Sequence, residues 1–391
     1  MDDSGLDRRE FLTCTLGAMG LCAAAPAFAG TPLYRGRDLP VKQIPGLPVK
    51  EKIELKEALF WNPTGAQVQC TLCPYYCQLK PGQRGPCRIR LNKGGKLYTE
   101  IFNAPAVIAT NAIEQGPFHH VLPGARFLAY GTAGCNLRCK YCQNWQFSQT
   151  TAADTKNYDV SADQMVAIAK QHNCRGIMYT FTEAVISIEY TMAVAKAARK
   201  AGLVNAVVTA AWIDEEPFAA LLKYIDVIRI DLKGFTEKFY KDVTAGSLEP
   251  VKRAIVAAHK SKAWLEVINM VVHGMNDDPN TFRPMVQWLR KNVGPKTPLH
   301  VTRFYPAYKL RNLPSSPANT ILKLRSIALE EGMKYVYAGN CPEKMDEYAT
   351  HCDKCGKLLL HRIGYITVDE NNMKDGKCKY CGNPIPGFWR P

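Results

Sequence analysis

The chain has 391 residues, of which 47% are hydrophobic and 22% are charged. This composition excludes a disordered or fibrous protein and provides enough chain for one large domain with one or two small ones. The formal net charge is +15, but the 50 Lys and Arg residues are spread along the chain without a block of five or six, so the charge alone does not indicate nucleic-acid binding.

The first 29 residues have the features of an export signal. An arginine pair at Arg8 and Arg9 precedes a mostly apolar run over residues 13–25, and a small-x-small triplet ends at Ala29. This pattern resembles a twin-arginine signal that is cleaved after Ala29. The apolar run is too short and too rich in Ala and Gly to predict a lasting membrane span. We therefore expect a periplasmic protein with no stable membrane span after cleavage, with a cytoplasmic location as the alternative.

Residues 30–120 are predicted to form a linker and an N-terminal metal-binding domain. The stretch 31–48 is Pro-rich and irregular, which indicates an extended arm. The stretch 68–105 is rich in Gly and Pro, which predicts turns and short strands. This segment contains four of the fifteen cysteines: Cys70, Cys73, Cys77 and Cys87. Four thiolates on such a frame can hold a zinc ion or an iron–sulfur cluster, and the spacing does not choose between them.

Residues 121–340 alternate between short apolar strands and helical stretches. The predicted strands are Phe127–Tyr130, Gly176–Phe181, Asn205–Thr209, Val227–Leu232, Leu265–Val272, Leu299–Tyr305 and Tyr335–Gly339. The predicted helices are Ala162–His172, Val185–Lys200, Glu216–Tyr224, Leu248–His259, Thr281–Asn292 and Asn319–Glu331. Six or seven such units predict an α/β fold whose parallel sheet closes into a full or partial (β/α) barrel, with ligand chemistry at the carboxyl ends of the strands.

Three cysteines follow the first predicted barrel strand in the motif GTAGCNLRCKYCQNW. At this CxxxCxxC spacing, Cys135, Cys139 and Cys142 can bind three irons of a 4Fe–4S cluster and leave the fourth iron without a protein ligand. The open iron can take the amino and carboxyl groups of S-adenosylmethionine (SAM), and one electron from the cluster then cleaves SAM to a 5′-deoxyadenosyl radical. A structural zinc ion would need a fourth ligand nearby, and the sequence offers no good one. We therefore predict a 4Fe–4S cluster and SAM as cofactors.

Residues 341–391 are predicted to form a third, small unit. Two CxxC pairs, Cys352 with Cys355 and Cys378 with Cys381, are separated by 22 intervening residues and lie close to glycines. This pattern indicates a zinc ribbon with a tetrahedral zinc ion. Rubredoxin-like iron, which would bring electrons into the protein, is the alternative.

The motifs together resemble one family over nearly the whole mature chain. The matching segments are CTLCPYYCQLKPGQRGPCRIR, NKGGKLY, the three-cysteine motif, YTFTEA, IRIDLKGF, LEPVKRAI, VVHGMNDD, HVTRFYPAYKL, CDKCG and CKYCGNPIPGFW. They are similar to segments of the AmmeMemoRadiSam-type radical SAM enzymes, which are relatives of the pyruvate formate-lyase activating enzymes. The resemblance implies a radical SAM barrel, an electron-donating reductant, and an AmmeMemo-type partner protein or a protein substrate.

The resemblance also implies several site residues. Thr182 and Glu183 stand where the superfamily has a Gly-Gly-Glu contact to the methionine amino group, and Tyr141 occupies the usual aromatic position before the third cysteine. Asp231 and Lys233 match an Asp-Leu-Lys signature of the activases, and we expect them either to face the site or to form a structural ion pair. Two further pocket residues are expected: Asn269 and Arg303. The activases' Thr-Asn-Gly is here Thr-Ala-Ala at residues 209–211, so no ribose contact is assigned there.

We therefore interpret the chain as a radical SAM enzyme in which Glu183, Asp231 and Lys233 serve the catalytic site. The substrate loses a hydrogen atom to the adenosyl radical and is not identified; a protein or peptide glycine is one candidate. One alternative is an exported electron-transfer protein with several iron–sulfur centres and no SAM chemistry, but such a protein would need no barrel. Another alternative is a nucleic-acid-modifying enzyme with the C-terminal ribbon as its RNA reader, although the sequence shows no basic stripe interleaved with aromatic residues. SAM is made in the cytoplasm, which keeps the cytoplasmic location open.

Overall fold

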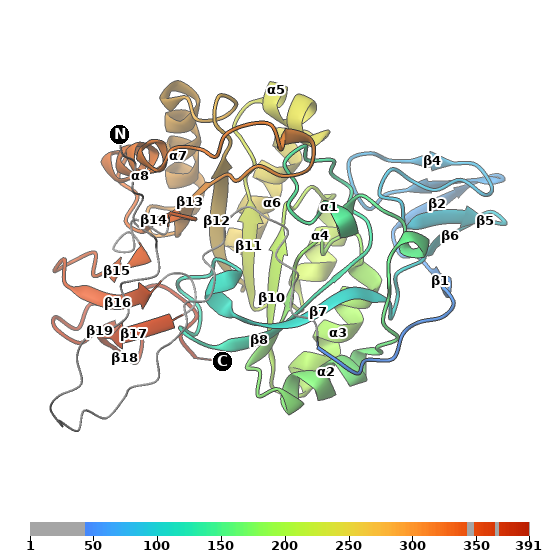
Figure 1. The fold of residues 1–391 in the computed structure, drawn as a ribbon, viewed down its shortest axis with the longest axis horizontal. Helices are drawn as coiled ribbons and strands as arrows, with labels where there is room; N and C mark the ends of the chain where they lie inside the picture. The colour runs from blue at the N-terminus through green and yellow to red at the C-terminus, as the bar shows by residue number, and fades with distance from the viewer. Residues whose placement is uncertain (1–43, 342–347, 364–366, 391) are drawn as a thin grey trace, which may run out of the picture. The chain divides into compact units, whose positions relative to one another are not determined.

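An eight-stranded sheet organises the chain in the computed structural model, which describes residues 44–341, 348–363 and 367–390 (Figure 1). The strands pair in the order β14-β13-β12-β11-β10-β9-β8-β7. All neighbours from β8 to β14 run parallel, and only β7 is antiparallel to its partner β8. Because β7 and β14 are the two edges, the sheet is an open, partial barrel, and the predicted α/β fold class is confirmed. The strands are β7 (Pro105–Ala112), β8 (Arg126–Thr132), β9 (Gly176–Tyr179), β10 (Val204–Thr209), β11 (Val227–Asp231), β12 (Trp264–Val271), β13 (Leu299–Arg303) and β14 (Val336–Gly339).

Six helices of eight residues or more connect the parallel strands, and each lies within a few residues of its predicted position. Local sequence sets several of their ends. The Ser161 hydroxyl accepts from the backbone N–H of Gln164 in a capping box before α2, and α7 begins with Asp278 as its cap and Pro279 in its first turn. The helices are α2 (Ala162–Gln171), α3 (Ile188–Lys200), α4 (Glu215–Leu222), α6 (Leu248–Lys260), α7 (Pro279–Val293) and α8 (Ala318–Glu330); α1 (Trp145–Ser148) and α5 (Glu237–Phe239) are short.

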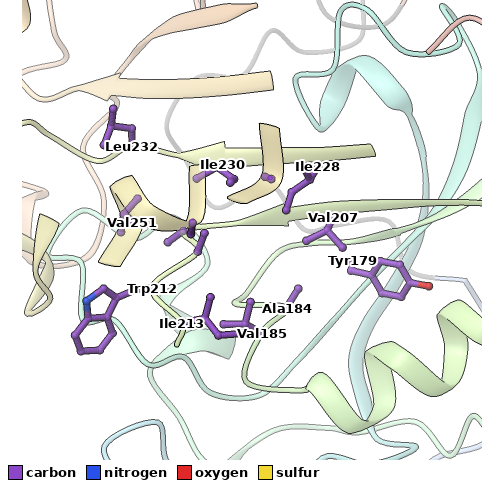
Figure 2. Close-up of a cluster of buried hydrophobic side chains, with 14 of the residues drawn as sticks. Tyr179, Ala184, Val185, Val207, Trp212, Ile213, Ile228, Ile230, Leu232 and Val251 are labelled. Atoms are coloured by element: carbon purple, nitrogen blue, oxygen red, sulfur yellow. The ribbon is translucent and has the colours of Figure 1, made fainter. Parts of the chain in front are cut away.

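The two faces of the sheet have different roles. On the helix side, Ile228 and Ile230 of β11 pack with Val207 of β10 in the main hydrophobic core (Figure 2). Because side chains alternate along a strand, Arg229 and Asp231 point to the opposite face, into the interior of the partial barrel. The barrel interior therefore carries the charges of Arg229 and Asp231 near the carboxyl end of β11.

The segment between β7 and β8 closes the interior at the amino ends of the strands. Phe118 and Val121 are fully buried there. His119 is also buried, and both its ring nitrogens lack a hydrogen-bond partner within the described residues. Its ring lies 4.4 Å from the ring of Tyr337 and 4.7 Å from that of His300. Burial lowers the pKa of His119 well below its usual value, so this imidazole is neutral in the folded protein.

Strand β7 is the one barrel element that the sequence analysis did not anticipate. Residues 105–112 were grouped with the N-terminal domain, but they form seven paired positions with β8. The first five residues of β7 are all buried, so the strand shows no alternation of apolar and polar residues. It also precedes the first strand–helix repeat, and for both reasons the pattern that identified the other strands did not mark it.

Small sheets lie on either side of the barrel in sequence. On the N-terminal side, β1 (Lys56–Glu57), β6 (Lys96–Thr99) and β5 (Arg90–Lys93) form one sheet, and β2 (Trp61–Thr64), β3 (Gln67–Cys70) and β4 (Gln78–Leu79) form another. On the C-terminal side there are β15 (Thr350–His351), β16 (Leu358–Ile363), β17 (Thr367–Asn371), β18 (Met373–Lys374) and β19 (Lys377–Cys378). The predicted export signal at residues 1–29 lies outside the described residues. Among those that are described, no helix is both long and apolar enough to span a membrane.

Candidate active site

The loop that follows β8 carries Cys135, Cys139 and Cys142, and backbone hydrogen bonds hold it in place. Within it, the amide of Arg138 donates to the carbonyl of Thr244 at 2.8 Å, and that of Lys140 donates to Val243 at 2.9 Å. The Asn136 side chain donates to the Trp212 carbonyl at 2.7 Å. These bonds tie the loop to the segments that follow β10 and β11. The cysteine loop therefore sits at the carboxyl ends of the strands, where parallel barrels place their chemistry.

The three thiols of this loop are in a setting that suits a cationic centre. Burial raises the pKa of Cys135 well above its usual value and that of Cys139 to about 12. Burial also raises the pKa of Cys142, whose Sγ lies 3.2 Å from the Ser148 hydroxyl. Without a cation these thiols stay protonated, and a bound metal centre makes the thiolates favourable. Three cysteines on one loop fit three irons of a 4Fe–4S cluster.

Glu183 lies beside this loop, on the segment after β9. Its side chain is 3% exposed; one carboxylate oxygen accepts from the Thr209 hydroxyl and from the amide of Val185 at 3.2 Å, and the other accepts from the amide of Ala210 at 2.8 Å. Burial raises the pKa of Glu183 despite these bonds, and its charge in turn raises the pKa of Cys135. The carboxylate is thus held in a fixed orientation next to the first cysteine.

Thr209 was not assigned a role from the sequence, and the structure gives it one. It ends β10, and its hydroxyl both donates to Glu183 and accepts from the amide of Ala211 at 2.8 Å. Thr182 differs from Glu183 in its surroundings, because its hydroxyl donates to the Thr132 carbonyl at 2.9 Å. That bond directs the Thr182 hydroxyl to the end of β8. Thr182 is also the position at which the sequence departs from the Gly-Gly-Glu pattern of the resemblance.

Asp231 and Lys233 form an ion pair that also faces the cysteine loop. The Lys233 ammonium lies 2.6 Å from one oxygen of Asp231, and the guanidinium of Arg229 lies 2.6 Å from the other. Burial opposes both charges, but the two cations hold the pKa of Asp231 below its usual value, and Asp231 raises the pKa of Lys233. Lys233 also lowers the pKa of Cys139 and lies 6.0 Å from the ring of the buried Tyr141. The structure therefore shows the ion pair, and the charge of Lys233 acts on Cys139 of the loop.

The two further expected pocket residues, Asn269 and Arg303, lie on β12 and β13. Asn269 shares a face of β12 with Val267 and Val271, which belong to the helix-side core, and its side chain donates to the Leu232 carbonyl at 2.7 Å. Strand alternation therefore directs the Asn269 side chain toward the helix layer, and its role in the pocket stays a prediction. Arg303 at the end of β13 donates to the Ser316 carbonyl at 2.5 Å and lies 5.3 Å from the Tyr305 ring. These contacts hold Arg303 against the loop that follows β13.

The four C-terminal cysteines meet as a compact tetrad. The Sγ atoms of Cys352 and Cys381 are 3.7 Å apart, and those of Cys355 and Cys378 are 3.8 Å apart. All four lie within 4.8 Å of one another. A tetrahedral ion with metal–sulfur distances of about 2.3 Å has sulfur–sulfur edges of about 3.8 Å. The predicted tetrad therefore has the dimensions of a site for one metal ion.

The fold and the cysteine loop define a class of protein: a partial (β/α) barrel with a three-cysteine cluster site at its mouth. A family model described as the Radical SAM superfamily matches residues 130–284. The uncharacterized protein MJ0808 of Methanocaldococcus jannaschii is 36% identical over 333 residues, which is 85% of this chain and 99% of that protein. The chain therefore contains a radical SAM domain over residues 130–284.

Solved structures of radical SAM enzymes resemble this chain at low sequence identity. A domain of a pyruvate-formate lyase-activating enzyme from Bacteroides vulgatus is 14% identical, with a TM-score of 0.37, over 42% of this chain and 98% of that one. A radical SAM methyltransferase from Sphaerobacter thermophilus is 13% identical, with a TM-score of 0.43, over 60% of this chain and 71% of that one. SuiB from Streptococcus suis, bound to SAM, is 11% identical, with a TM-score of 0.44, over 55% of this chain and 52% of that one.

Proposed function

We propose that this protein binds a 4Fe–4S cluster through Cys135, Cys139 and Cys142 and uses it to cleave SAM, so that a 5′-deoxyadenosyl radical abstracts a hydrogen atom from a substrate at the barrel mouth. The observation that carries the proposal is the buried carboxylate of Glu183 fixed beside Cys135. When bound, the cluster supplies the electron for SAM cleavage. A radical abstraction needs positioning more than proton transfer, and the rigid loop contacts supply that positioning.

The residues around the loop have separate parts in this proposal. Glu183, oriented by Thr209 and the Ala210 amide, accepts hydrogen bonds from the amino group of SAM. Lys233 keeps a positive charge next to Cys139 and favours the thiolate that iron needs. Asp231 fixes the Lys233 ammonium at 2.6 Å, so that this charge stays in place when solvent leaves the site.

The finer assignment follows from the motifs in the sequence. We propose an AmmeMemoRadiSam-type enzyme whose substrate is a protein or peptide and which cooperates with an AmmeMemo-type partner. The compact C-terminal tetrad favours a structural zinc ion, because zinc prefers closed tetrahedral thiolate sites. The twin-arginine pattern supports export of the folded protein to the periplasm. A low-potential protein would be the reductant of the 4Fe–4S cluster.

The deciding experiment measures 5′-deoxyadenosine under anaerobic conditions. The mature chain is reconstituted with iron and sulfide, reduced with dithionite and mixed with SAM, beside a variant in which Cys135, Cys139 and Cys142 are all changed to Ala. We expect product from the parent and none from the variant. A parent that holds a reduced 4Fe–4S cluster but forms no deoxyadenosine would refute the proposal and favour an electron carrier.

A further inference from the structure

The four N-terminal cysteines surround one small cavity although they come from separate turns. Cys70 ends β3, and its amide donates to the carbonyl of Cys77 at 3.0 Å across the turn. Cys73 lies inside that turn, and Cys87 follows β4 in the next loop. Three of the four are buried and Cys77 is half-buried, and all four line the same cavity. The fold therefore assembles the thiols into one site.

The sulfur spacing of this site differs from that of the C-terminal tetrad. Among the described residues, only the C-terminal four bring at least three candidate ligand atoms within 4.8 Å of one another. The N-terminal four therefore frame a wider space than a single tetrahedral ion, whose sulfur–sulfur edges are about 3.8 Å. Cys135, Cys139 and Cys142 share this wider spacing. A cluster binds each cysteine through a different iron, so its ligands stand further apart than those of one ion.

A glycine leaves the space between two of these sulfurs open. A Cβ atom built on Gly85 would lie 3.7 Å from Sγ of Cys87 and 3.8 Å from Sγ of Cys77. Its φ is not in the left-handed region, so the backbone does not require glycine here. Gly85 instead keeps side-chain atoms out of the cavity, whose walls include the apolar side chains of Leu72 and Leu79. Thiols and apolar side chains therefore line the cavity, and Gly85 adds no side-chain atom to it.

A buried cation stands at the wall of the cavity. Arg90 is 1% exposed, and its Nη1 lies 3.9 Å from Sγ of Cys70. Its Nη2 donates to Glu189 at 2.5 Å, and Nη1 donates to the Leu59 carbonyl at 2.8 Å. The buried carboxylate of Glu189 balances the charge of the guanidinium. A guanidinium in this position offsets the negative charge of a thiolate-bound centre and stabilises an added electron.

The cavity directly adjoins the cysteine loop of the barrel. A Cβ atom on Gly134, the residue before Cys135, would lie 2.5 Å from the Cys87 carbonyl oxygen, so the two loops touch. Asn136 of the barrel loop lines the cavity. Tyr75 also lines the cavity, and its hydroxyl donates to the Ala245 carbonyl at 2.9 Å. The N-terminal cysteine site and the three-cysteine loop of the barrel are therefore neighbours, as electron transfer between two centres requires.

We propose that Cys70, Cys73, Cys77 and Cys87 bind a second iron–sulfur cluster of the 4Fe–4S type, rather than a single zinc ion, and that this cluster takes up one electron from a low-potential donor. Uptake of the electron lowers the cluster charge from 2+ to 1+ and forms or breaks no bond. Passing this electron to the barrel cluster rests on the proposed function, whereas the presence of the second cluster does not.

The test uses the full chain in which Cys135, Cys139 and Cys142 are changed to Ala, so that only the second site can hold a cluster. After anaerobic reconstitution with ferrous iron and sulfide, we expect about four acid-labile sulfides per chain and, after reduction with dithionite, an electron paramagnetic resonance signal. Adding Cys70→Ser and Cys73→Ser should abolish both. Acid-labile sulfide is the decisive quantity, because neither zinc nor rubredoxin-like iron contains it.

Two controls keep the result interpretable. Cys352→Ser with Cys355→Ser, on the same triple-alanine background, should keep the sulfide and the signal because it changes only the C-terminal tetrad. Circular dichroism reports whether each variant folds, and in the otherwise unchanged chain Cys70→Ser with Cys73→Ser should halve the sulfide content. Absence of acid-labile sulfide in a folded triple-alanine variant, with or without bound zinc, would overturn the proposal. None of these measurements uses SAM, so they are independent of the cleavage assay.

Discussion

Gly134 offers the sharpest test of the contact between the N-terminal cysteines and the barrel loop. Its φ is +84°, and a Cβ atom there would lie 2.5 Å from the Cys87 carbonyl oxygen and 2.7 Å from a methyl carbon of Ile89. Gly134→Ala should therefore destabilise the fold for two reasons. The left-handed backbone costs a non-glycine residue about 1–2 kcal/mol, and forcing a methyl group into packed atoms adds about 1–3 kcal/mol, so the unfolding free energy should fall by about 2–5 kcal/mol.

Gly274 provides the matched control. Its φ is +74°, but nothing lies within 4 Å of the position of its Cβ atom, so Gly274→Ala should cost only the backbone contribution of about 1–2 kcal/mol. Anaerobic urea unfolding followed by tryptophan fluorescence gives both values, and iron analysis should show a loss of iron in Gly134→Ala alone. Equal unfolding midpoints and equal iron contents in the two variants would refute the close packing of the two loops.

Three further variants test the site and the barrel floor. Glu183→Gln should weaken SAM binding about 10- to 100-fold in equilibrium dialysis, because one charge-assisted hydrogen bond is lost. The control Glu249→Gln, on the exposed side of α6, should leave SAM binding unchanged. Asp231→Asn should lower the unfolding free energy by about 3 kcal/mol because two adjacent cations lose their carboxylate; an unchanged value would contradict this. His119 is neutral when folded but titrates near pH 6.5 when unfolded, so its stabilisation is present above that pH and falls by about 2 kcal/mol on going to pH 5. His119→Phe should flatten this loss, the exposed His259→Phe should not, and parallel pH profiles for parent and His119→Phe would argue against a buried neutral imidazole.

The sequence predicted the parallel part of the barrel well because its strands are short, apolar and separated by regular helices. The seven expected strands correspond to β8–β14, and the six expected helices to the longer helices. The same approach missed β7, since a strand buried along most of its length shows no alternation. Its antiparallel pairing with β8 depends on the tertiary fold, which local patterns do not contain.

Strand alternation decides which face of the sheet each predicted pocket residue occupies. Arg229, Asp231 and Lys233 occur at every second position, so one face of β11 and its extension had to carry all three charges. Asn269 shares the parity of Val267, which the same rule places on the helix side. The sequence could have predicted that Thr209 lies near the end of β9, because the ends of adjacent parallel strands lie side by side. It could not have predicted the hydrogen bond from Thr209 to Glu183, because that bond depends on the path of the loop after β9.

The compact C-terminal tetrad has a different relation to the barrel from that of the two wide cysteine sets. Tyr335, at the amino end of edge strand β14, donates to Asp353 beside Cys352 at 3.1 Å. The amide of Phe388 donates to the His120 carbonyl on the barrel floor at 2.7 Å. The tetrad is therefore anchored at the amino ends of the strands, whereas the cysteine loop lies at their carboxyl ends. A metal ion there would hold the unit that packs against the edge strand β14 and buries it. Removal of the ion should therefore destabilise the fold while leaving the barrel cluster in place.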